Sequence, residues 1–286
     1  MTEENVATNA GLRSADPGEG SSLRAALSSG PPPSPPGPTA AALVLGWRAL
    51  LKIKHNPQQL FDAVAFPIMI TLIFTFLFGG AIAGSTGDYL QYVLPGILVL
   101  AVVMISMNTG VALNTDVAKG IFDRFRSMPI WRPATLVGPL LGDAVRYAVA
   151  ATVALVVGVL LGFRPSGGVL GAVLGVLMAI LFAFSLAWLW TVLGMLMREP
   201  ESVMNVSSMA LFPLAFGSNI FVDPQTMPSW LEVVVTINPV THAVAAVRGL
   251  MHGSLDAGQL LWALLICAVL VLALAPITLY LYLNKN

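Results

Sequence analysis

The sequence predicts an all-α, polytopic membrane protein with six transmembrane helices, an N-terminal amphipathic elbow helix and short re-entrant extracellular helices before the last span. Of its 286 residues, 57% are hydrophobic and only 10% are charged, whereas a soluble domain carries roughly 25% charged residues. The mean hydropathy of +0.83 agrees with this class. The chain also contains several uncharged runs of the length, about 20 residues, that a helix needs to cross a bilayer.

The first 39 residues predict a tail without a folded core. Residues 1–39 are rich in Gly, Ser, Ala and Pro and finish in a proline-rich run from Pro31 to Pro38. Such a composition cannot bury a hydrophobic core, and its last stretch favours an extended polyproline conformation. We therefore expect residues 1–39 to be a disordered cytoplasmic tail and residues 40–286 to form the transmembrane domain.

Residues 40–56 have the pattern of an amphipathic helix. Arg48, Lys52 and His55 lie away from its apolar face. A helix of this kind lies in the plane of the membrane interface, and Pro57 favours a break before the first span. A cytoplasmic extension of the first span is the alternative interpretation. The apolar positions are Leu43, Trp47, Leu50 and Leu51.

Six segments have the length and polarity of membrane-spanning helices. The third carries Asp143 and Arg146 near its start, and the others contain long stretches without charge. The predicted spans are 61–82, 90–113, 138–163, 170–196, 202–222 and 257–283.

Glycines recur at every fourth position in two of these spans. Gly158 and Gly162 do so at the end of span three, and Gly167, Gly171 and Gly175 at the start of span four. Small residues at this spacing let two helices approach closely. We favour tight packing within the chain over a dimer interface.

The region before the last span decides the number of crossings. The stretch from Ser229 to Met251 is apolar enough to suggest a seventh span, yet it carries polar residues whose burial in lipid is costly. Asn238 followed by Pro239 is also a typical helix start. We expect two short helices, about 227–236 and 239–252, that enter the outer leaflet without crossing. The polar residues are Glu232, Asn238, His242 and Arg248, and Pro239 lies among them.

The distribution of basic residues predicts the orientation. If the N-terminus is inside, the outside segments hold only Arg164 and Arg248. The positive-inside rule therefore favours both termini in the cytoplasm. The basic residues of the cytoplasmic segments are Arg48, Lys52, Lys54, Lys119, Arg124, Arg126, Arg132, Arg198 and Lys285, with Arg146 near that face.

We find no catalytic or metal-binding motif in the sequence. Cys267 is the one cysteine, and His242 and His252 lack a third ligand of metal-binding spacing. The phosphate-binding motif G-x-x-x-x-G-K-[ST] does not occur, so we expect ATP and Mg²⁺ to be bound by a separate polypeptide. The 14 basic and 14 acidic residues cancel, which speaks against nucleic acid as a partner.

The loop from Asn114 to Pro139 holds the densest polar sequence. A short helix there has an apolar stripe, from which Arg124 and Arg126 point away, and Pro129 ends it. Such a helix can dock into a groove of a cytosolic partner, although seating on lipid headgroups explains the pattern equally well. The stripe consists of Ile121, Phe122, Phe125 and Met128.

Polar residues within the spans mark a possible substrate path. Span five is the most polar, and interhelical hydrogen bonding explains its composition as well as a path does. The path residues we select are Asn108, Thr109, Asn205, Ser208, Ser218 and Asn219.

Asp143 and Arg146 form a candidate charge pair inside the membrane. They lie three residues apart on one face of span three, which is close enough to pair. Charge within a membrane marks a functional candidate. We favour an interfacial interpretation, in which Arg146 extends to the headgroups.

Several of these motifs resemble bacterial ABC-2 type permeases, and most closely the daunorubicin-resistance branch. The run from Asp123 to Ile130, continuing to Leu140-Leu141-Gly142-Asp143, is similar to the family's signature before its third span. The remaining similar segments are Arg48–Leu51 with Asn56-Pro57, Phe76–Gly79, Met227–Leu231, Asn238–His242 and Ala246–Gly249.

The resemblance covers residues 40–284 and implies a permease in the bacterial cytoplasmic membrane. It implies a dimer of two permease copies that couples to a separate ATPase subunit through its cytoplasmic loops. Carried over by position, it makes residues 120–128 the coupling helix. The coupling residues are then Gly120, Phe122, Asp123, Arg124, Phe125, Arg126 and Met128.

These observations predict the transport subunit of an ATP-driven exporter, without catalytic residues or an ATPase of its own, that moves amphipathic drug-like or lipid-like molecules outward. We expect closure of the ATPase to push on residues 120–128 and to tilt spans one, two and five. One alternative is a polysaccharide, teichoic-acid or glycolipid exporter of the same superfamily, which needs a wider polar corridor. Another is an ion-driven carrier, which predicts ionisable groups at mid-membrane.

Overall fold

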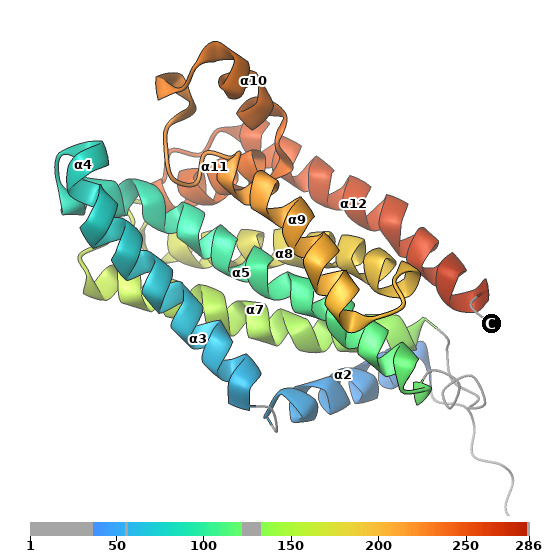
Figure 1. Ribbon diagram of the computed structural model, residues 1–286. Coiled ribbons are helices and arrows are strands. Elements are labelled where there is room, and N and C mark those ends of the chain that lie inside the picture. Colours follow the sequence, from blue (N-terminus) through green and yellow to red (C-terminus); the bar gives the residue numbers. More distant parts are fainter. Residues whose placement is uncertain (1–36, 55–56, 122–132, 285–286) are drawn as a thin grey trace, which may run out of the picture. The chain divides into compact units, whose positions relative to one another are not determined.

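The computed structural model describes residues 37–54, 57–121 and 133–284, and within these ranges it is helical without strands. The predicted all-α class is confirmed. The predicted tail, apart from residues 37–39, lies outside the described residues. The elements are α2 (Pro38–Lys54), α3 (Pro57–Leu72), the π-helix η1 (Ile73–Phe78), α4 (Gly79–Ala83), α5 (Thr86–Ala118), α7 (Ala134–Leu160), α8 (Gly168–Leu196), α9 (Pro200–Phe216), the 3-10 turn η2 (Pro224–Thr226), α10 (Ser229–Ile237), α11 (Pro239–His252) and α12 (Ala257–Asn284) (Figure 1).

Within the described ranges, five helices are long and apolar enough to cross a membrane, or six if the bent pair α10–α11 counts as one broken span. The first, Phe61–Ala83, runs through α3, η1 and α4 in series, and the others are α5, α7, α8 and α12. The predicted spans one, two, three, four and six fall on these helices. Span three ends at Leu160 rather than 163, because the chain turns at Gly162, whose φ is 109°.

Helix α5 forms the core of the bundle. From Val93 to Val103 every residue is buried, and the helix packs against α7, α8, α9 and α11. By contrast, α12 and the first span expose many large apolar side chains, such as Leu272 and Leu77. Apolar side chains that face hydrocarbon need no burial inside the protein, so this exposure fits a bundle embedded in lipid.

The predicted fifth span has a shorter helix than expected. Helix α9 ends at Phe216 rather than at 222, because the chain leaves helical geometry after Gly217, whose N–H donates to Pro213 O. Its 17 residues make about 25 Å of helix, less than the roughly 30 Å of a hydrocarbon core. The non-helical residues 217–222 carry the chain on in the same direction as α9.

The chain from Met197 to Phe221 nevertheless covers the same depth as α5. Just before α9, the Asn114 side chain donates to Met197 O at 2.8 Å. Just after α9, the Tyr89 hydroxyl donates to Phe221 O at 3.1 Å. Asn114 and Tyr89 are separated by about 37 Å along α5, so α9 with residues 217–222 runs antiparallel to α5 over that distance (Figure 1).

Helix α11 lies across one end of the bundle. It meets α10 at an angle of 79°, at Asn238, whose amide donates to Leu214 O and Gly217 O at the end of α9. At its other end, the His252 ring is 3.0 Å from Gln91 O at the start of α5. Both ends of α11 are therefore tied to the end of the bundle where α5 begins.

Four of the five glycines of the predicted pattern pack within the chain, whereas Gly162 lies in the turn after α7 with no atom within 4 Å of an added Cβ. A Cβ on Gly167 or Gly171 would overlap Leu250 O of α11, and one on Gly175 would lie 2.9 Å from the Met251 side chain. A Cβ on Gly158 would overlap the Leu94 side chain of α5. These glycines let α8 approach α11 and let α7 approach α5.

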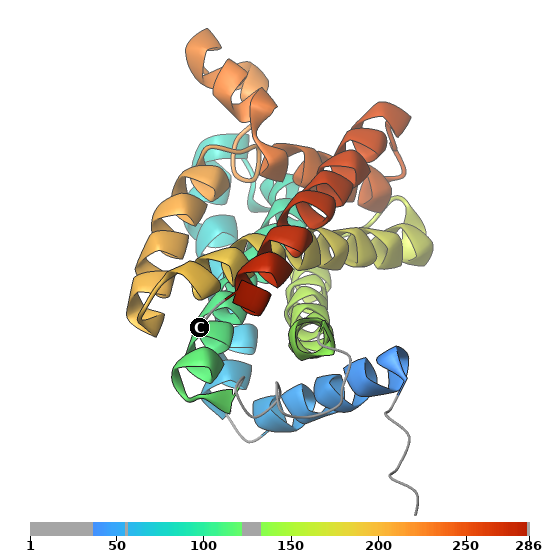
Figure 2. The same ribbon diagram turned by 90° about the vertical axis from the view of Figure 1, so that its right-hand side faces the viewer.

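Helix α2 lies across the beginning of α7 (Figure 2). A Cβ on Gly46 would lie 3.3 Å from Gly138 O, so the two backbones are close there. Three residues of the predicted apolar face, Leu43, Trp47 and Leu51, point away from the described protein and are 67%, 65% and 41% exposed. Such exposure of apolar side chains is what a helix in the membrane interface requires.

Candidate functional site

The predicted coupling loop joins the end of α5 to the start of α7. We call this end of the bundle, where α5 finishes at Ala118 and α7 begins at Ala134, the loop end. Gly120 turns the chain just after α5 with a φ of 65°, and its N–H donates to Val117 O at 3.0 Å. The other predicted coupling residues lie outside the described residues. They are Phe122, Asp123, Arg124, Phe125, Arg126 and Met128.

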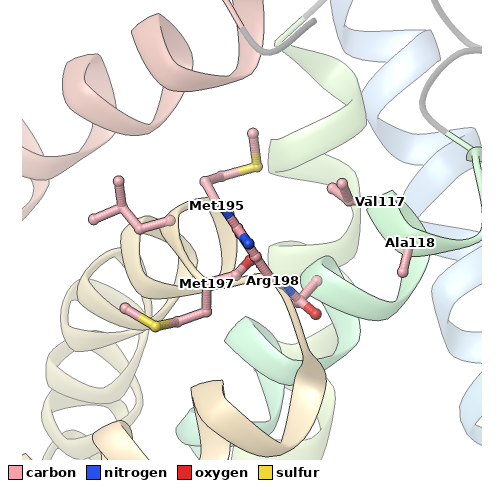
Figure 3. A pocket seen from close by; sticks show the side chains of 7 residues that line it. Val117, Ala118, Met195, Met197 and Arg198 are labelled. Atoms are coloured by element: carbon pink, nitrogen blue, oxygen red, sulfur yellow. Dashed lines mark hydrogen bonds between the residues drawn. The ribbon is translucent and has the colours of Figure 1, made fainter.

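A pocket of about 400 Å³ lies at the loop end, between α5 and the turn from α8 to α9. In Figure 3, Val117 and Ala118 lie on one side of it, and Met195 and Met197 on the other. The lining is apolar except for one amide and one guanidinium. The lining residues are Asn114, Val117, Ala118, Met195, Leu196, Met197 and Arg198.

Asn114 holds this turn against α5. Its side-chain amide donates to Gly194 O in the last turn of α8 at 2.9 Å and to the O atom of the C-cap residue Met197 at 2.8 Å. Such carbonyls have no partner within their own helix. Asn114 therefore caps α8 from another helix and fixes the place where α9 begins.

The contact between α5 and α8 is close because it has glycine on both sides. A Cβ on Gly110 would overlap the Trp190 carbonyl, and a Cβ on Gly194 would overlap Gly110 O. One turn before Gly110 on α5, the Ser106 hydroxyl accepts a hydrogen bond from the Trp190 indole N–H at 2.8 Å. These contacts fix both the separation and the register of the two helices.

Asp143 and Arg146 pair inside the protein. Arg146 Nη1 donates to Asp143 Oδ1 at 2.9 Å, and the side chains of Arg146 and Asp143 are only 4% and 9% exposed. A second nitrogen, Arg146 Nη2, lies 3.5 Å from Ile105 O of α5. The interpretation of Arg146 as a side chain that extends to the headgroups is wrong, because the guanidinium turns inward to α5.

The carboxylate of Asp143 also joins α7 to α5. The Thr109 hydroxyl donates to Asp143 Oδ2 at 2.6 Å and lies 2.9 Å from the Tyr147 hydroxyl. A threonine hydroxyl has one hydrogen. Since that hydrogen goes to the carboxylate, Tyr147 is the donor to Thr109. We call Ile105, Thr109, Asp143, Arg146 and Tyr147 the polar clamp.

The residues predicted to line a substrate path do not gather in one place. Thr109 belongs to the polar clamp, and Asn108 beside it is half-buried. Asn205 is exposed on α9. Ser208 and Ser218 donate locally, to Met204 O and Ala215 O, so both hydroxyls serve their own segment.

At the end opposite the loop, Arg248 fastens α11 to two other segments. Its guanidinium lies 4.0 Å from the centre of the Tyr92 ring and donates to Tyr92 O at 3.2 Å. It also donates to Asn219 O at 3.0 Å, and the Tyr92 hydroxyl donates to the same carbonyl at 3.1 Å. Asn219, selected for the path, thus acts through its backbone, while its buried side-chain oxygen has no hydrogen-bond donor.

The other residues of the predicted re-entrant region have structural positions. Asn238 accepts the N–H of Val240 at 2.9 Å and so caps α11, with Pro239 at the first helical position. His242 stacks on Trp262 of α12, with ring centres 6.2 Å apart. Among the described residues, no group of three or more His, Cys, Asp or Glu side chains could hold a metal ion.

Several contacts at the loop end could not be chosen from the sequence. Ser106, Asn114, Tyr147 and Trp190 are polar or amphipathic residues in long apolar runs. Their types are compatible with hydrogen bonds between helices, but which pairs form depends on the rotation and register of each helix. The sequence shows that each of these residues lies in a mostly apolar run, but it does not show which residue is its hydrogen-bond partner.

Comparison with known proteins gives consistent matches over most of the chain. The family model described as ABC-2 type transporter matches residues 40–252. The daunorubicin resistance ABC transporter permease protein DrrB1 of Streptomyces coeruleorubidus is 47% identical over 264 residues, which cover 92% of this chain and 93% of that protein.

Two more distant relatives match at 26% identity. The probable doxorubicin resistance ABC transporter permease protein DrrC of Mycobacterium tuberculosis aligns with 80% of this chain and 84% of its own length. The putative transport permease ycf38 of Cyanophora paradoxa aligns with 74% of each chain.

Proposed function

This chain belongs to the ABC-2 type transporter family, and from that premise we propose that it is the permease subunit of an exporter that moves amphipathic drug-like or lipid-like molecules outward. A separate ATPase subunit hydrolyses the ATP, and this chain contributes no ATPase of its own. The names of two relatives, a daunorubicin and a doxorubicin resistance permease, support a drug-like cargo.

The observation that supports this function best is the construction of the loop end. In the half of the bundle nearest that end, α5, α7 and α8 are joined by directional contacts: the polar clamp, the Asn114 amide and the Trp190–Ser106 hydrogen bond. A permease that is driven by a separate ATPase subunit needs a rigid platform at the place where that subunit pushes on it. We propose that the segment from Gly120 to Met128 docks on the ATPase at this platform.

The membrane topology follows from the same proposal. Helix α9 with residues 217–222 is the fifth of six crossings, because it covers the depth of α5. The α10–α11 pair is re-entrant, because both ends of α11 are tied to one end of the bundle. The loop end then faces the bacterial cytoplasm with both termini, α2 rests on the membrane surface as an elbow helix, and a second permease copy completes the transporter.

The two alternative functions receive less support from the described residues. A polysaccharide exporter needs a broad polar corridor, whereas the selected polar residues are dispersed and two of the serines are bonded locally. An ion-driven carrier needs ionisable groups that can change partners. The Asp143–Arg146 pair is enclosed by protein and bonded to α5 from both side chains.

Charge reversal in the loop tests the proposed coupling. In the complex with its ATPase, Arg124→Glu combined with Arg126→Glu should abolish the stimulation of ATP hydrolysis by substrate, because two charges that face the partner change sign. Arg164→Glu is the matched control, since it makes the same change in an exposed residue at the opposite end. If coupled transport by the double variant equals that of the wild type, this segment is not the coupling helix.

A further inference from the structure

We propose that Thr109, Asp143 and Arg146 are positioning residues that make α5 and α7 move as one body when the loop between them is displaced. This inference rests on the proposed function, because it concerns how force that enters at the loop crosses the membrane domain. It assigns the buried charge pair to transmission rather than to substrate binding.

The location of the polar clamp fits this purpose. Thr109 lies nine residues before the end of α5 at Ala118, and Asp143 nine residues after the start of α7 at Ala134. Both residues are therefore about 14 Å from the loop end along their helices. The clamp joins the two helices at equal distances from the loop that connects them.

The bonds in the clamp resist sliding in a way that apolar packing does not. Apolar contacts are non-directional, so two helices held only by them can shift against each other. Hydrogen bonds weaken steeply when misaligned, and those to a charged group are about twice as strong as neutral ones. The Thr109–Asp143 and Arg146–Ile105 contacts run between α5 and α7 from both members of the ion pair.

A role in stability alone accounts poorly for this arrangement. Removing two charges from water is costly, and apolar replacements of a buried pair are often neutral or stabilising. The pair also leaves Arg146 Nε buried without an acceptor. What a buried pair supplies is one defined geometry, and here that geometry relates two helices.

Helix α8 is joined to the same body on another face of α5. Gly110 and Gly194 bring the two backbones into contact, and Asn114 caps α8. Spans two, three and four therefore form one unit, so displacement of the loop should carry span two together with spans three and four rather than by itself.

Hydroxyl replacement separates transmission from stability. Thr109→Val removes the bond to Asp143 at nearly constant volume, and Thr109→Ser keeps it. Thr191→Val is the matched control, because its hydroxyl lies 3.2 Å from that of Thr278 and joins α8 to α12, outside the proposed path. Each variant is reconstituted with the ATPase subunit in liposomes, and the amphipathic dye Hoechst 33342 moved per ATP hydrolysed is measured.

We expect Thr109→Val to lower the amount of dye moved per ATP about fivefold or more, while its rate of ATP hydrolysis stays within about twofold of wild type. In Thr109→Ser and Thr191→Val, the amount of dye moved per ATP should stay within about twofold of wild type. An unchanged ratio in Thr109→Val overturns the inference, and so does an equal loss in Thr191→Val. A wild-type complex that moves no dye with ATP would instead contradict the proposed function.

A second measurement leaves the clamp intact and so does not depend on the folding of a clamp variant. Spin labels are placed on cysteines at Val111 of α5 and Leu141 of α7, in a Cys267→Ala background. We expect the same distance distribution without nucleotide and with ATP trapped in the partner subunit. If the α5–α7 distance changes, the two helices are not one body.

Discussion

The guanidinium of Arg248 lies 4.0 Å from the centre of the Tyr92 ring, which joins two residues 156 positions apart. The same side chain donates to Tyr92 O and Asn219 O, so one residue of α11 holds both the start of α5 and the segment after α9. Residues 217–222 are non-helical, and their carbonyls need donors from elsewhere in a membrane protein. Arg248 is one such donor.

Replacing Arg248 should therefore destabilise the end of the bundle opposite the loop. Arg248→Ala removes a charged donor from two carbonyls and loses the cation–π contact, which together predict a loss of about 2 kcal/mol. Arg248→Lys should lose less, because an ammonium still donates but cannot reproduce the planar fork. Thermal unfolding of the purified protein in detergent measures both variants.

Arg164→Ala serves as the control for this comparison, since Arg164 is exposed at the same end. Exposed substitutions usually change stability by less than about 0.5 kcal/mol. Equal melting temperatures for Arg248→Ala and Arg164→Ala would mean that Arg248 does not hold these segments together.

The contact between α5 and α8 predicts a contrast between two glycines of the same helix. At Gly110 an added Cβ would overlap the Trp190 carbonyl, whereas at Gly87 it would meet no atom within 4 Å. Gly110→Ala should cost about 1–3 kcal/mol, because a backbone on the other side cannot move aside easily. Gly87→Ala should be neutral or slightly stabilising. The readout is the melting temperature and the yield of folded protein; similar values for the two variants would place α8 further from α5.

The proposed topology predicts which engineered cysteines are reached from each side. In a Cys267→Ala background, Ser254→Cys lies in the exposed turn before α12, and Lys119→Cys lies exposed at the loop end. A membrane-impermeant maleimide added to intact cells should label Ser254→Cys, and should label Lys119→Cys only after permeabilisation. The reverse pattern would invert the orientation, and labelling of both from outside would contradict the crossing by α9.

The choice of Asp143 and Arg146 shows how far local spacing reaches. A spacing of three residues along a helix is enough to predict that two side chains can pair, and Asp143 and Arg146 do pair. The direction in which Arg146 points was predicted wrongly, because position along a helix does not say which face meets protein and which meets lipid. That face is decided by Ile105 and Thr109 of another helix.

The fifth span shows a similar limit. Its uncharged run predicted helix to 222, but the chain leaves the helix at Gly217. A non-helical segment in a membrane is tolerated where other elements satisfy its carbonyls, and here Tyr89, Tyr92 and Arg248 do so. These three donors all lie outside residues 202–222, so the sequence of the span itself does not identify them.

By itself, the sequence determined that the chain is a membrane protein, that it is helical, where most of its spans lie and which family it belongs to. These properties depend on composition, on the length of uncharged runs and on motifs, and all three are local along the chain. The tertiary structure alone decided that Thr109 bonds Asp143, that Gly110 faces Trp190 and that Arg248 reaches Asn219. The physical reason is that a polar side chain within an apolar span can find its partner on any neighbouring helix, and the partner is chosen by how the helices rotate and slide to bury their surfaces together.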